Sequence, residues 1–103
     1  MEIDNINDIT TQNIQFQLKD NSIIYITLKF LDNINCWFMN IQYKDFTLNN
    51  IQLTYNDNIL SQYENILPFG IQITSKSGLN PMGRQCFINK DNSIIINEKV
   101  NND

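Results

Sequence analysis

The chemically reactive side chains of this chain are mainly carboxylates, and their positions decide whether they could act together. The sequence has 11 Asp and Glu residues and no His, so the most common general base and metal ligand is missing. Two carboxylates can hydrolyse glycosidic bonds when they lie ~5–10 Å apart in a cleft. The aspartates fall mostly in predicted turns or tails, where their side chains bond nearby backbone N–H groups. They are Asp4, Asp8, Asp20, Asp32, Asp45, Asp57, Asp91 and Asp103. We therefore predict that the protein is not an enzyme and uses no cofactor.

No metal site is predicted either. Two cysteines, Cys36 and Cys86, are too few for a structural zinc site in a chain without His. The acidic segment DNINDITTQN lacks the glycine of a calcium-binding loop. We expect both cysteines to be reduced and to behave as small apolar groups, and a disulfide would require neighbouring strands that bring them within ~7 Å.

Two further segments invite a ligand-binding interpretation. The loop SGLNPMGR lacks the glycine spacing and the following helix of a phosphate-binding loop, so we do not expect it to bind phosphate. Trp37 could stack on a sugar, or it could fill the core of a small domain. It shares its alternation with Met39 and Ile41, which favours the core, while a carbohydrate-binding β-sandwich remains the alternative.

Charge excludes two classes of partner. The net charge is −4, and the seven basic residues are scattered singly, so we expect no specific nucleic-acid binding and no attraction to anionic membranes. No apolar run approaches the ~20 residues that span a bilayer, and the N-terminus is acidic where a signal peptide would be basic. We therefore expect no membrane insertion, and folding in a cytoplasm.

These side chains must be positioned by β-strands, because large apolar residues recur at every second position along most of the chain. Short polar turns between the first four strands favour an antiparallel meander. Residues 49–50 are expected to form a bulge or a kink in the fourth strand. The predicted strands cover residues 13–19, 22–31, 37–43, 46–55, 69–76, 84–89 and 93–97.

The remaining segments complete the predicted fold. Asp57 is expected to cap a helix of about two turns that Pro68 ends, and Asp91 with Asn92 to turn a final hairpin. The prediction is a mainly β protein: a small antiparallel β-barrel or sandwich of about seven strands with one short helix. Its length fits one domain, which we place at residues 13–97, after an N-terminal arm (1–12) and before a polar tail (98–103).

The order of these segments is similar to that of the phage baseplate plug family. The similarity covers about residues 13–90 and includes WFMNIQY, the segment IQLTYNDNILSQY, LPFGIQI and NPMGRQCFIN. Its spaced pattern consists of Trp37, Leu60, Tyr63, Gly70, Pro81 and Gly83. Family members often have glycine at the turn after the tryptophan strand, where this chain has Lys44 and Asp45.

The resemblance implies structural work at the distal end of a contractile phage tail or a tailocin. The partners would be hub, tube and spike proteins and symmetry-related copies of the chain, in a particle assembled in the bacterial host cytoplasm. Interfaces are expected on the arm and on the loop of residues 79–84, where Arg84 could pair with a carboxylate of a partner. The candidate interface residues are Ile3, Ile6, Ile9, Leu79, Met82 and Arg84.

Overall fold

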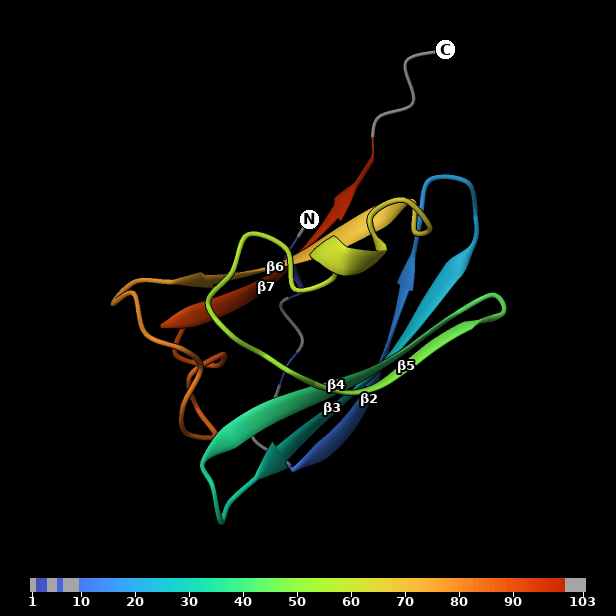
Figure 1. Ribbon diagram of the computed structural model, residues 1–103. Coiled ribbons are helices and arrows are strands. Elements are labelled where there is room, and N and C mark those ends of the chain that lie inside the picture. The colour runs from blue at the N-terminus through green and yellow to red at the C-terminus, as the bar shows by residue number, and fades with distance from the viewer. Residues whose placement is uncertain (1, 4–5, 7–9, 100–103) are drawn as a thin grey trace.

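The protein is a two-layer β-sandwich in the computed structural model, which describes residues 2–3, 6 and 10–99 (Figure 1). One sheet has the strand order β1-β7-β6 and the other the order β2-β3-β4-β5, and all pairs are antiparallel. The two sheets are not joined into a closed barrel, so of the two predicted architectures the sandwich is confirmed. The strands are β1 (Glu2–Ile3), β2 (Thr11–Gln17), β3 (Ile23–Leu31), β4 (Cys36–Tyr43), β5 (Phe46–Gln52), β6 (Phe69–Ser75) and β7 (Asn92–Glu98).

The four-stranded sheet is the predicted meander, and alternation explains its buried face. Ile26 lies opposite Ile41, and Phe30 lies opposite Trp37, so inward residues of neighbouring strands stack in register. Trp37 is fully buried, with its ring 5.2 Å from that of Phe30 and 5.3 Å from that of Phe87. Trp37 is therefore a core residue, as the alternation predicted.

The predicted bulge in β5 is also confirmed. Met39 pairs with Ile51 and Ile41 with Leu48, so β5 has one residue more than β4 between these pairs. Asn50 adopts a φ of 60°, and its N–H donates to Oδ1 of Asn40 over 2.7 Å. Asn tolerates this left-handed conformation better than most residues, which is why the extra residue is accommodated here.

The predicted two-turn helix is wrong. Within residues 57–68, which the structure describes in full, only Ser61–Tyr63 is helical, as a single 3-10 turn (η1). Its N-cap is Leu60, which makes no side-chain cap bond. Asp57 therefore caps no helix. The preceding segment runs along the outer edge of β6 instead, because Asn56 exchanges backbone hydrogen bonds with Ile73, and the N–H of Ile59 donates to the carbonyl of Ile71.

The predicted final hairpin is wrong as well. Residues 84–90 form successive turns, and β7 pairs with β6 on one side and with β1 on the other. The apolar pair Cys86 and Phe87 suggested a strand, but both side chains are buried from within a loop. Burial of a loop residue and burial of a strand residue look alike in a sequence.

The terminal segments pack on the sandwich as far as the structure describes them. Glu2–Ile3 pair with β7, and Ile3 is buried in the core. Lys90 Nζ lies 2.8 Å from the Glu2 carboxylate, and this hydrogen bond holds the pKa of Glu2 below its ordinary value. Thr11 and Gln12, which the sequence places in the predicted arm, are the first two residues of β2. At the other end β7 continues to Glu98, and residues 100–103 lie outside the described part.

Residues 56–59, which we call the covering segment, are held against the outer edge of β6 by Asn58. Replacement of the Asn58 side chain is therefore expected to destabilise the fold. Its Oδ1 accepts the N–H of Leu60 at 2.9 Å and of Ile71 at 3.1 Å. A Cβ on Gly70 would stand 2.9 Å from the Asn58 amide group, so a glycine allows this approach. We expect Asn58→Ala to lower the free energy of unfolding by about 1–3 kcal/mol, as unpaired N–H groups do. Asn58→Asp, which keeps the acceptor oxygen, is the control in urea denaturation. Equal losses in both variants would contradict this role.

Candidate interface at the β3–β4 end of the sandwich

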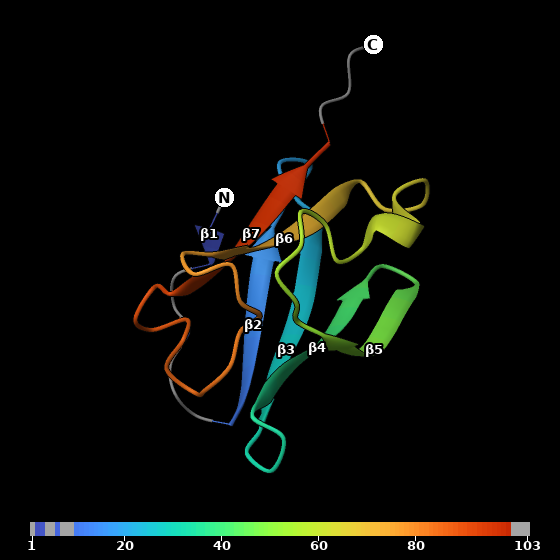
Figure 2. The same ribbon diagram turned by 60° about the vertical axis from the view of Figure 1, so that its left-hand side comes forward.

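The loop of residues 76–91 lies against the β3–β4 end of the four-stranded sheet (Figures 1 and 2). The loop connects β6 to β7, which are both strands of the three-stranded sheet. Met82 forms an isolated antiparallel bridge with Cys36, the first residue of β4, which in turn pairs with Leu31 at the end of β3. The loop therefore joins the two layers and extends the surface of the four-stranded sheet at this end.

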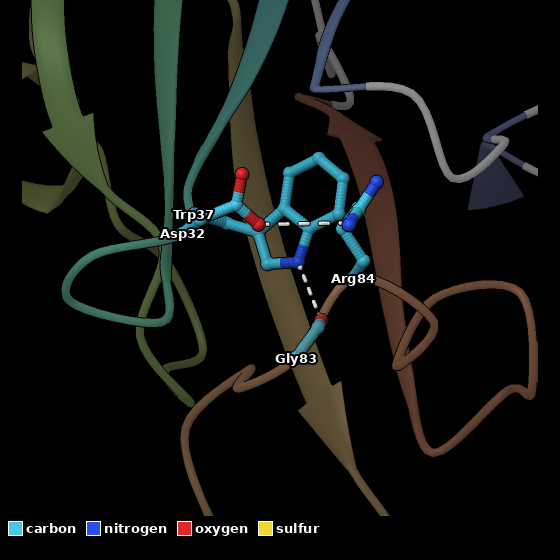
Figure 3. Close-up of polar contacts among 4 residues, drawn as sticks. All are labelled: Asp32, Trp37, Gly83 and Arg84. Atoms are coloured by element: carbon cyan, nitrogen blue, oxygen red, sulfur yellow. Dashed lines mark hydrogen bonds and ion pairs between the residues drawn. The ribbon is translucent and has the colours of Figure 1, made fainter.

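The indole of Trp37 holds the loop from inside. Its Nε1–H donates to the carbonyl of Gly83 over 3.0 Å (Figure 3). Gly83 has a φ of 87°, a conformation that glycine adopts without steric cost. Because the indole is fully buried and its N–H is occupied, it cannot serve as a platform for a sugar. The carbohydrate-binding alternative thus loses the residue on which it depended.

Polar contacts fix the rest of the loop. The buried Asn92 donates from Nδ2 to the carbonyls of Thr74 at 3.0 Å and Leu79 at 3.3 Å. The N–H of Leu79 donates to the Ser75 hydroxyl at 3.0 Å, and Asn80 Oδ1 accepts the N–H of Tyr55 at 2.8 Å. A loop anchored at so many points presents its exposed side chains in a defined arrangement, which lowers the entropic cost of binding.

One ion pair crosses between the loop and the β3–β4 turn. Arg84 Nε lies 3.6 Å from Oδ1 of Asp32, and Figure 3 shows the two side chains reaching toward one another. The side chains are 49% and 64% exposed, so water screens the pair and its contribution to stability is at most about 1 kcal/mol. Arg84 is thus held near the surface, where its guanidinium remains accessible to a partner.

Exposed apolar side chains lie on the same two segments as this ion pair. Leu31, Ile34, Leu79 and Met82 are 42–64% exposed, and with Arg84 we call them the loop-end patch. A hollow of about 340 Å³ next to it is lined by residues that include Leu79, Met82, Cys86 and Asn92. Apolar groups beside an arginine are typical of the centre of protein interfaces.

The candidate residues predicted from the sequence fall into two groups. Leu79, Met82 and Arg84 are all exposed in the loop-end patch. Ile3 is buried in the core of the chain, Ile6 is partly buried against that core, and Ile9 lies outside the described residues. Sequence reasoning missed Leu31 and Ile34. Leu31 follows the inward Phe30 directly, and Ile34 stands in a polar turn, so both depart from the alternation and could have been found that way.

The cysteines are free thiols, and no metal centre is formed around them. Cys86 is buried, and this burial raises its pKa to about 11. Within the described residues, no group of three or more His, Cys, Asp or Glu side chains is placed to hold a metal ion. No helix in that part of the chain has the length and apolar character needed to cross a membrane.

The protein is a small β-sandwich with an anchored, partly apolar loop on its surface. Such a surface is typical of a subunit that binds other proteins. The chain belongs to a family of phage tail proteins: the family model described as cyanophage baseplate Pam3 plug gp18 matches residues 1–98. No curated protein matches this chain. The protein is therefore a structural component of a phage tail baseplate that contacts other tail proteins, and the predicted resemblance is confirmed.

The structure gives physical roles to the residues that carried the resemblance. Leu60 is buried, Gly70 makes room for Asn58, and Gly83 accepts the Trp37 hydrogen bond. Lys44, in the turn after β4, adopts a φ of 52°, a left-handed conformation for which glycine is suited. Within the pattern, Gly70 thus allows residues 56–59 to approach β6, and Trp37 with Gly83 holds the loop of residues 76–91.

Proposed function

We propose that this protein plugs or connects the distal tube end of a contractile phage tail, or of a related tailocin, and joins it to hub and spike proteins. It acts without catalysis, in several copies related by the symmetry of the tail, and assembles in the bacterial host cytoplasm. The family match over residues 1–98 is the observation that carries the proposal.

The loop-end patch is the surface we propose for contact with a neighbouring tail protein. Leu79 and Met82 would lose exposed apolar area on binding, and Arg84 could form a two-pronged hydrogen-bonded pair with a carboxylate of the neighbour. The net charge of −4 supports a position beside the tube, because a surface without a basic patch does not retain passing DNA.

Charged substitutions in the patch are expected to block incorporation into particles. We expect the double variant Leu79→Glu with Met82→Glu to reduce its copies per particle at least about tenfold, because two desolvated carboxylates oppose an apolar contact. Particles are produced by expressing the tail gene cluster with a tagged copy of the chain, and an immunoblot of purified particles gives the amount incorporated.

The matched control carries two glutamates on exposed apolar positions elsewhere, Tyr25→Glu with Ile66→Glu, which are 46% and 68% exposed. This control should be incorporated as the natural chain is. Normal incorporation of the patch variant, with the same folding stability, would remove the patch from the proposal, and absence of the natural chain from particles would remove the proposed function itself.

A further inference from the structure

β5 is an edge strand whose outer side is open. It pairs with β4 along one side, and the described residues show no backbone hydrogen bond to β5 from the other side. In Figure 2 no other ribbon runs along this outer edge. By contrast, the outer edge of β6 is covered by the segment that contains Asn56 and Ile59. An open edge with unpaired backbone groups is a template for adding another strand.

The usual protection of such an edge is weak here. Natural edge strands carry charges, especially Lys, or proline, and often a bulge. No residue from Phe46 to Leu53 is charged or a proline, in a chain with 7 basic and 11 acidic residues, and only the bulge at residues 49–50 remains. The inward side chains Phe46, Leu48 and Ile51 are only half-buried, so apolar surface is left to cover.

The sequence of this edge is a palindrome in its pattern of apolar and polar residues. FTLNNIQL has the same pattern in both directions about the centre between Asn49 and Asn50. The bulge preserves this symmetry in three dimensions, because it shifts the alternation so that Leu48 and Ile51 both face inward. Thr47 and Gln52 are both exposed on the opposite face.

We propose that two copies of the chain pair in solution through their β5 edges, antiparallel, about a two-fold axis between Asn49 and Asn50. Leu48 then lies opposite Ile51 of the second copy, and Thr47 opposite Gln52, so every opposed pair shares a face. No residue of β5 is charged, so no like charges meet within the paired strands. The two four-stranded sheets become one continuous sheet of eight strands.

The backbone is oriented for this pairing. The N–H of Leu53 donates to the carbonyl of Trp37 on β4, so the N–H and carbonyl of Gln52, one residue earlier, point away from β4. The two bulges lie together at the axis and leave the pairs on either side undisturbed. Copies arranged around the axis of a ring contact one another through two different surfaces, whereas a two-fold pair uses the same surface on both copies. The two-fold pair is therefore a state of the free protein, and it dissociates when copies enter a ring.

A charge-swap experiment on the purified chain tests the pairing. Thr47→Lys with Gln52→Lys places lysines opposite each other twice across the axis, and we expect the dissociation constant to rise at least about tenfold. Thr47→Lys with Gln52→Glu places Lys opposite Glu twice, and should keep or strengthen the pair. Sedimentation over a concentration series from about 1 μM to 1 mM gives the constants, and Trp37 fluorescence confirms folding.

A control with the same charges on the outer face of β2, Asn13→Lys with Gln15→Lys, should leave association unchanged. A natural chain that stays monomeric at all concentrations would overturn the proposal, and so would equal effects of the Lys–Lys and Lys–Glu variants. The inference goes beyond the proposed function and concerns the free chain. Its failure would leave incorporation into particles untouched, and loss of the proposed function would not alter the sedimentation result.

Discussion

Replacement of Trp37 by phenylalanine is expected to lower the free energy of unfolding by about 2–4 kcal/mol and to loosen the loop of residues 76–91. The indole is fully buried between Phe30 and Phe87, so the smaller ring leaves a cavity. Phenylalanine also lacks the Nε1–H that donates to Gly83, and leaves this carbonyl without its partner. The loss should therefore appear both in overall stability and in the order of the loop.

Two measurements separate these effects. Urea denaturation followed by circular dichroism gives the stability, and trypsin cleavage after Arg84, in native conditions, reports opening of the loop. A matched control, Ile26→Val, makes a smaller cavity in the same core without touching the loop and should cost about 0.5–1.5 kcal/mol. If cleavage after Arg84 is no faster in Trp37→Phe than in this control, the indole hydrogen bond does not hold the loop.

The substitution Asn92→Asp is expected to cost about 3 kcal/mol at neutral pH and much less in acid. The side chain is 5% exposed, and its Nδ2 donates to the carbonyls of Thr74 and Leu79. An ionised carboxylate has no proton to donate, so it would face these two carbonyl oxygens at a buried position. Its pKa in the folded state should therefore rise above that of the unfolded chain, because the charged form is disfavoured.

The sign of the pH dependence follows from that raised pKa. Below the unfolded pKa the group is protonated in both states and the variant keeps most of its stability, and stability is lost as pH rises through the folded pKa. Denaturation midpoints of the variant and the natural chain, compared between about pH 3.5 and pH 7.5, test this. Asn92→Ala serves as the control, since its deficit should not depend on pH. A parallel pH profile for Asn92→Asp would show that the site admits water.

Much of the sandwich could be predicted because alternation has an unambiguous period. Trp37, Met39 and Ile41 point inward as expected, and even the bulge at residues 49–50 follows from two consecutive asparagines between apolar runs. Local pattern failed where tertiary contacts decide. Ile59, Leu60 and Tyr63 have helical spacing, yet the edge of β6 offers their segment backbone partners, and only one 3-10 turn forms.

The candidate site could be predicted only in part, for a related reason. Leu79, Met82 and Arg84 were predicted because two glycines and a proline indicate a loop there, and because Arg84 could pair with a carboxylate of a partner. Leu31 and Ile34 are distant in sequence and are brought to this end by tertiary contacts such as the bridge between Cys36 and Met82, which no local pattern encodes. Ile3 illustrates the reverse case, since its acidic surroundings suggested an arm, although a strand pairing buries it.

Because Glu2 pairs with Ile95, this contact can form only after nearly the whole chain has been synthesised. The meander of β2 to β5 uses neighbouring segments and can form while synthesis is still in progress, since short loops close fast. β1 has no strand partner until β7 emerges, and β6 has only the segment of Asn56 and Ile59 beside it until then. A nascent chain stalled before Asn92 would therefore expose the apolar face of β6.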